Sequence, residues 1–162
     1  MNFDQADALN QAIRLLSLRH RARAETLLAP LGLHAGQEVL LLELARNGPR
    51  IQAQLSDALG CEPPSVTLMA RKLEASGHIR RRPSPADARA SIVELTDSGK
   101  ALADRVKRLW CDLAEESVAG LAAGTVRQLP GILNAITANV DTRHPRHRSG
   151  PGRQAARSHQ EA

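Results

Sequence analysis

Aromatic side chains are almost missing from this sequence. Phe3 and Trp110 are the only two among 162 residues, and tyrosine is absent. Strands of sandwiches and barrels are usually rich in aromatic and β-branched residues. The core must therefore be built from leucine, isoleucine, valine and alanine, which favours helices packed on helices.

Cysteine is also scarce. Cys61 and Cys111 are the only two, too few for a disulfide framework or a cysteine metal cluster. We find no spacing typical of a nucleotide-binding loop, a dinucleotide fingerprint, a nucleophile elbow or a His/Cys metal site. We therefore expect no enzyme activity, no cofactor and no metal. Because Cys111 lies beside Trp110 on an aliphatic seam, we expect it in the core.

Long apolar runs are absent as well. No stretch of 18 apolar residues is present, so we expect no membrane span. The first residues, 1–5, lack the basic region and apolar core of a signal peptide. We therefore expect a cytoplasmic protein, associated with the nucleoid if its partner is DNA.

Positive charge is in excess, and much of it lies near the C-terminus. The formal net charge is +5, and residues 141–162 hold five basic and two acidic residues, which makes +3. This segment has almost no apolar content, so we expect a disordered basic tail. Residues 1–140 form the folded domain and carry the remaining +2.

Two helical regions are expected to flank the middle of the chain. Residues 4–30 contain no glycine or proline before Pro30, which predicts one long helix. Residues 97–140 contain two helical patterns, the first beginning after Thr96, a good N-cap. Pro130-Gly131 is expected to kink or split the second. Narrow apolar seams typical of helix–helix packing run along both: Leu102, Val106, Leu109 and Leu113, then Val126, Leu129, Leu133, Ile136 and Val140.

Residues 34–96 have the pattern of a helix-turn-helix followed by a hairpin. A short helical pattern over 52–59 ends at Gly60, and a second runs from Pro64 to Ser76 and ends at Gly77. Residues 78–82 and 90–95 read as two strands around a polar loop. The expected fold is mainly α with a small β-wing, a winged helix-turn-helix core between terminal helices.

The second of these helices has an exposed face suited to reading DNA. With Val66 at the centre of the buried face, helical spacing of about 100° per residue defines the opposite one. Small or hydroxyl side chains allow close approach to base edges, cations can reach phosphates or guanine, and Leu68 can meet a thymine methyl. The outward residues are Pro64, Ser65, Thr67, Leu68, Arg71, Lys72 and Ala75.

Local charge supports the same assignment. Residues 63–90 contain six basic and two acidic residues, a balance of +4. A basic helix face is often only solvated, and arginines at 80–82 could simply protect a sheet edge. A helix-turn-helix can also bind protein, so a protein-interaction module without sequence-specific DNA binding is the alternative.

Several motifs resemble the MarR family of transcriptional regulators. The run PPSVTLMARKLEASGHIRRR is similar to that family's recognition helix and first wing strand, Asp87-Ala88-Arg89 to its D-x-R wing signature, and LTDSGKAL to the start of its fifth helix. The resemblance extends over residues 5–140, and residues 31–102 are its specific part.

The resemblance implies a homodimeric regulator, typically a ligand- or signal-responsive repressor, bound to a pseudo-palindromic operator in double-stranded DNA. It implies that helices 4–30 and 97–140 form the dimer. Arg89 would enter the minor groove, and Asp87 would order the wing. The resemblance implies major-groove contacts for Ser65, Thr67, Arg71 and Lys72, and backbone contacts for Arg80 and Arg82.

The sequence departs from the family pattern at four places. Leu68 stands where arginine is frequent, and Ala88 replaces a residue that is usually charged. His34-Ala35 replaces a Ser- or Thr-led helix start and predicts a weaker cap. Pro130 interrupts the last helix.

Two further sites are candidates. Many members of the family bind small anionic or phenolic effectors in a cleft, which Arg19, His20 and Arg23 could line here. Cys61 precedes the recognition helix near arginines, where its pKa could fall, and a redox-sensing regulator is thus a second alternative. The sequence does not identify an operator or an effector.

Overall fold

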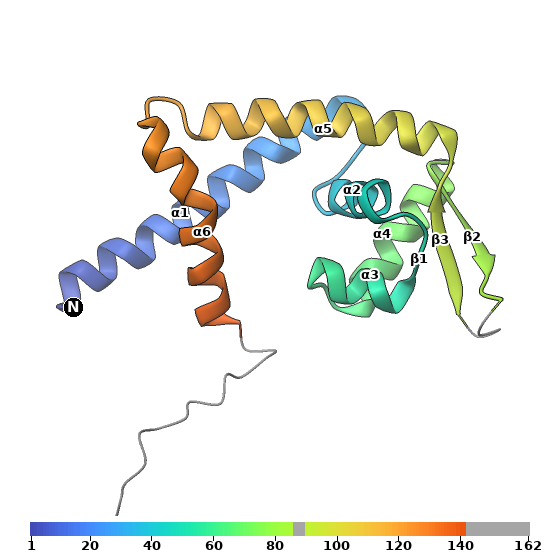
Figure 1. Cartoon of the computed structure of the whole chain (residues 1–162), viewed down its shortest axis with the longest axis horizontal. Coiled ribbons are helices and arrows are strands. Elements are labelled where there is room, and N and C mark those ends of the chain that lie inside the picture. Colours follow the sequence, from blue (N-terminus) through green and yellow to red (C-terminus); the bar gives the residue numbers. More distant parts are fainter. Residues whose placement is uncertain (86–89, 142–162) are drawn as a thin grey trace, which may run out of the picture. The chain divides into compact units, whose positions relative to one another are not determined.

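The computed structural model describes residues 1–85 and 90–141, and its elements are predominantly helical (Figure 1). The chain divides into two compact units, Met1–Ala119 and Gly120–Ala162. The elements are α1 (Phe3–Leu28), η1 (Ala29–Leu31), α2 (Gln37–Asn47), β1 (Arg50–Ile51), α3 (Gln52–Leu59), α4 (Pro63–Ala75), β2 (Ile79–Pro83), β3 (Ser91–Leu95), α5 (Asp97–Ser117) and α6 (Ala123–Val140).

The core of the first unit is aliphatic, as expected. α2, α3 and α4 pack on one another, and α5 packs on α1 and α2. Trp110 lies at the edge of this core and is only half-buried. The residues of the core cluster come from α1 to α5, the sheet and the loop before α2: Leu28, Leu33, Leu40, Leu41, Leu44, Leu55, Val66, Ala70, Leu73, Ile79, Val93, Leu102, Ala103 and Val106.

A small antiparallel sheet completes the unit, with strand order β1-β3-β2. Ile79 pairs with Leu95, and Pro83 pairs with Ser91. Side chains alternate between the faces of a strand: Ile79, Arg81 and Val93 share the inner face, where Ile79 and Val93 are buried, and Arg80 and Arg82 face outward. β1 has only two residues, too few to produce a recognisable sequence pattern.

The start of α2 lacks a conventional cap, as the sequence predicts. Gly36 occupies the N-cap position with φ of 103° and offers no side chain. Two side chains within the helix partly replace it: Glu38 Oε2 accepts from the Gly36 N–H at 2.6 Å, and Gln37 Oε1 accepts from the His34 N–H at 2.8 Å. A Cβ on Gly36 would lie 3.0 Å from Met69 Sδ, so the turn is tightly packed against α4.

In the C-terminal helices, the split expected at Pro130 and the burial expected for Cys111 are both wrong. α6 continues through Pro130, where proline removes one hydrogen bond of the helix and the turns on both sides keep theirs. Cys111 is exposed. It lies five residues beyond the buried Val106, about 140° around the helix.

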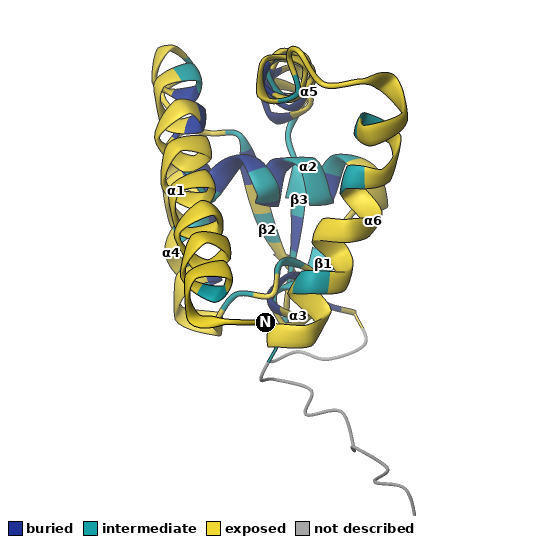
Figure 2. Cartoon of the chain, turned by 90° about the vertical axis from the view of Figure 1, so that its left-hand side faces the viewer, coloured by how far each residue is buried: buried dark blue, intermediate teal, exposed yellow. Residues whose placement is uncertain are grey.

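Most residues of α1 and of α6 are exposed, as the yellow colour of each helix shows in Figure 2, and large apolar residues are among them. In α1 only Ala24 and Leu28 are buried, and in α6 no described residue is. No helix in the described part of the chain is long and apolar enough to cross a membrane. The large exposed apolar residues of these two helices include Leu9, Ile13, Leu15, Leu16, Leu18, Ile132, Leu133 and Val140.

Candidate nucleic-acid interface

The helix-turn-helix is formed by α3 and α4. Gly60 ends α3 in the left-handed conformation with φ of 61°, and Pro63 opens the first turn of α4, where no N–H is needed. Val66, Ala70 and Leu73 bury one face of α4. The opposite face is exposed, and it holds the predicted residues Ser65, Leu68, Arg71 and Lys72.

The cations of this face have no acidic partner in the described structure. Among the described residues, neither Arg71 nor Lys72 forms an ion pair or a side-chain hydrogen bond. The Ser65 side chain is exposed as well. Each of these groups can therefore meet a phosphate or base without first breaking an internal contact.

Thr67 lies differently from its neighbours. It is half-buried, and its hydroxyl donates to the Pro63 carbonyl at 2.8 Å. The same oxygen accepts from Nε2 of Gln52, the first residue of α3. The hydroxyl thus joins the two helices, and the γ-methyl is the part of the side chain without a polar partner. Gln52 is a positioning residue that the sequence pattern did not reveal.

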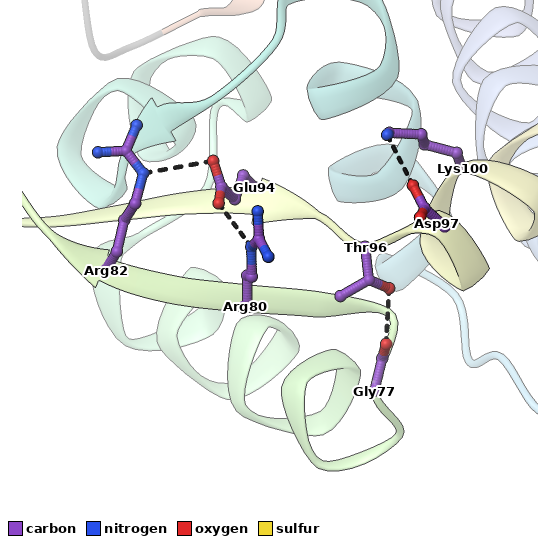
Figure 3. A network of polar contacts seen from close by, with 7 residues as sticks. All are labelled: Gly77, Arg80, Arg82, Glu94, Thr96, Asp97 and Lys100. Carbon is purple, nitrogen blue, oxygen red and sulfur yellow. Dashed lines mark hydrogen bonds and ion pairs between the residues drawn. The ribbon is translucent and has the colours of Figure 1, made fainter.

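The three arginines of β2 are all paired. Arg80 Nε lies 2.6 Å from Glu94 Oε1, and Arg82 Nε lies 3.3 Å from Glu94 Oε2 (Figure 3). The hydrogen bond from Arg80 is the main reason why the pKa of Glu94 is lowered from its ordinary value. Because one carboxylate faces two guanidinium groups, this outer face of the hairpin carries +1 rather than +2.

Arg81 points to the other face of the hairpin, toward α4. Its Nε lies 3.1 Å from Glu74 Oε2, and no aligned hydrogen bond satisfies Nε or Nη2. This pair connects the wing to the C-terminal turn of the recognition helix. The predicted tip residues Asp87, Ala88 and Arg89 lie outside the described residues.

The exit of α4 is joined directly to the start of α5. Thr96 Oγ1 donates to the Gly77 carbonyl at 2.7 Å (Figure 3). As the predicted N-cap, it also accepts from the Gly99 N–H at 3.1 Å. Ser98 Oγ also donates to Gly77 O, at 2.9 Å. A Cβ on Gly99 would lie 1.9 Å from the His78 carbonyl oxygen. Only glycine fits there.

A pocket of about 430 Å³ lies at the C-terminal end of α1. The candidates Arg19, His20 and Arg23 do not line it, and Arg23 instead pairs with Glu116 on α5 at 3.0 Å. Arg21, from the same basic run, lies 3.2 Å from Glu25. The lining residues are Arg21, Glu25, Ala29, Gly32, Leu33, His34 and Ala35.

The redox candidate Cys61 and the buried acid Glu38 have simpler environments. Cys61 is half-buried against the core, and its Sγ lies 3.5 Å from the Leu59 carbonyl oxygen. Glu38 is 5% exposed, and burial raises its pKa from the ordinary value. Within residues 1–85 and 90–141, no group of histidine, cysteine or acidic residues is arranged to hold a metal ion.

A helix-turn-helix followed by a basic hairpin defines a winged-helix DNA-binding protein. The MarR family model matches residues 33–91. The HTH-type transcriptional repressor NicR of Pseudomonas putida is 30% identical over 122 residues, covering 75% of this chain and 77% of NicR. The chain belongs to the MarR family and is a DNA-binding transcriptional regulator.

Two further comparisons agree. The multiple antibiotic resistance protein MarR of Salmonella typhimurium is 27% identical over 135 residues, which cover 83% of this chain and 94% of that protein. The crystal structure of a mutant MarR from E. coli complexed with operator DNA matches with a TM-score of 0.75 and 25% identity, covering 84% of this chain and 98% of that one. The family is one of regulators rather than enzymes.

Proposed function

We propose that this regulator is a repressor that binds a pseudo-palindromic, double-stranded operator as a homodimer. In this proposal residues 34–96 read the DNA, with α4 in the major groove and the wing beside it. Residues 4–30 and 97–140 form the dimer. The observation that carries the proposal is the exposed face of α4, where Arg71 and Lys72 have no internal partner among the described residues.

The predicted DNA contacts fall into groups with different surroundings, and we assign each group its own role. Ser65, Arg71 and Lys72 are exposed and unpaired in the described structure, and they are the proposed direct contacts. Arg80 and Arg82 share Glu94, so they are proposed to contact phosphates in a fixed orientation. Asp87 and Arg89 keep the wing-tip roles that the family resemblance implies.

The dimer proposal rests on the uncovered apolar side chains of α1 and α6. Leu16 is 53% exposed and Leu133 is 46% exposed. Contiguous exposed apolar surface on a helix marks a protein contact. A twofold dimer would also present two copies of α4 to the two halves of a palindrome.

Binding is tested by fluorescence anisotropy with labelled duplexes selected from a random pool. Arg71→Ala and Lys72→Ala should each weaken binding by roughly 1–3 kcal/mol, and affinity should fall steeply with salt as counterions are released. Arg105→Ala, which removes an equal charge from α5, is the control. The titration should saturate at two chains per duplex. Unchanged affinity in both variants would contradict the proposal.

The pocket at the end of α1 is the proposed effector site. Arg21 supplies a cation that a small carboxylate or phenolate could contact, and His34 adds a ring nitrogen. Repeating the titration with small aromatic carboxylates, in wild type and Arg21→Ala, tests this assignment. Release of DNA in wild type and not in the variant would support it, and equal release in both would refute it.

A further inference from the structure

Leu68 is a large apolar side chain placed in the middle of the exposed face of α4. It is 57% exposed, and its neighbours on that face, Ser65, Arg71 and Lys72, are polar or charged. An exposed leucine alone requires no explanation. This one lies where α4 would face the base edges, so its chemistry determines what the helix can recognise there.

The residue before it presents hydrocarbon too. The Thr67 hydroxyl is occupied on both sides, as donor to the Pro63 carbonyl and as acceptor from Gln52. The hydroxyl hydrogen is committed to Pro63, so Thr67 could donate to a base only by breaking that contact, and one lone pair of the oxygen is left as an acceptor. The γ-methyl has no polar contact. At two consecutive positions the recognition helix therefore carries methyl groups and has no free side-chain hydrogen-bond donor.

The major groove displays one apolar group, the C5-methyl of thymine. A leucine packed there removes hydrocarbon from water on both sides of the contact. The same leucine against cytosine or guanine would cover a donor or an acceptor without replacing its hydrogen bond, which is unfavourable. Arg71 and Lys72 can hold phosphates, but phosphate contacts do not distinguish sequences.

We propose that Leu68 is a specificity-determining residue that reads a thymine methyl, with the γ-methyl of Thr67 packed beside it. This inference rests on the proposed function, because it requires α4 to lie in the major groove. At the base pair that faces Leu68, the preferred base would then be chosen by its methyl group and not by hydrogen bonds to guanine.

The test replaces single thymidines of the selected operator by deoxyuridine, which removes the methyl and keeps the base pairing. At one position in each half-site, this change should weaken wild-type binding about 3- to 10-fold. In Leu68→Ala the same change should have no effect, because the contact is already lost. Lys72→Ala, which removes a cation of the same helix and leaves Leu68 in place, should weaken binding but keep the full deoxyuridine penalty, because a phosphate contact does not distinguish thymine from uracil.

The outcomes separate this inference from the proposed function. If the operator is bound specifically but Leu68→Ala retains the full deoxyuridine penalty, the thymine assignment is wrong and the regulator proposal stands. If no deoxyuridine position weakens wild-type binding, the assignment is wrong as well. If the selection yields no preferred sequence, both proposals fail. Thermal unfolding of Leu68→Ala should match wild type, because the side chain is exposed.

Discussion

Gly99 permits the tightest backbone contact found among the described glycines, and replacing it should be costly. A Cβ at this position would lie 1.9 Å from the His78 carbonyl oxygen and 2.9 Å from its carbon. Real Cβ contacts essentially never fall below 3.0 Å. The oxygen cannot simply rotate away, because it also accepts the Thr96 N–H at 3.1 Å. Gly99→Ala must therefore separate α5 from the end of α4.

The size of the effect follows from three contributions. Forcing a methyl into a packed site costs about 1–3 kcal/mol, and losing the Thr96–His78 hydrogen bond costs about 1 kcal/mol more. The better helix propensity of alanine returns about 1 kcal/mol. The net loss is about 3 kcal/mol at the upper end of this range. For a chain of this size that corresponds to a fall in Tm of about 6–12 °C.

The assay is thermal unfolding followed by circular dichroism, with all variants at one protein concentration because association shifts Tm. Gly124→Ala is the matched control, since a Cβ there has nothing within 4 Å. That variant should keep or slightly raise the Tm. If Gly99→Ala melted within about 2 °C of wild type, the close approach of α5 to His78 would be wrong.

Two further predictions concern acidic side chains. The free energy of unfolding of Glu38→Gln, relative to that of wild type, should be higher at pH 7.5 than at pH 4. Burial raises the Glu38 pKa, so wild type loses stability as the pH rises from 4.5 through that raised pKa, and glutamine does not titrate. Urea unfolding of both proteins at the two pH values measures these free energies. An advantage of the variant that is larger at pH 4 than at pH 7.5 would contradict the prediction. Glu94→Gln should make the dependence of log Kd on log salt steeper by about one phosphate contact, because it frees Arg80 and Arg82 and removes a negative charge. Glu115→Gln on α5 carries the same charge change and should leave the slope unaltered; an equal slope in both variants would show that Glu94 does not restrain the wing.

The fold was largely predictable because its signals are local. Gly60, Pro63 and Gly77 punctuate the helix-turn-helix, and apolar periodicity identifies the buried faces. The errors arose where local patterns compete with longer-range structure. Pro130 carries a strong breaking signal but sits within a helix that continues on both sides. Cys111 is next to a core residue in sequence and on another side of the helix in space.

The interface residues were predictable as a set but not in their individual roles. Helical geometry places Arg71 and Thr67 on the same outward surface, yet one is unpaired in the described structure and the other is bound to Gln52. That distinction depends on how α3 packs on α4. Similarly, the pairing of Arg80 and Arg82 with Glu94 depends on the strand register, which was not assigned from the sequence.

The joint between α4 and α5 has a mechanical consequence. Gly77 and His78 are held to Thr96 and Ser98 by four hydrogen bonds and lie so close to Gly99 that no Cβ fits there. The end of α4 and the start of α5 are therefore fixed to each other. α5 has 21 residues, which makes it a lever about 32 Å long. If α5 tilted by about 3° about its C-terminal end, its N-terminal end would move by about 1.7 Å. The recognition helix α4 would move with it.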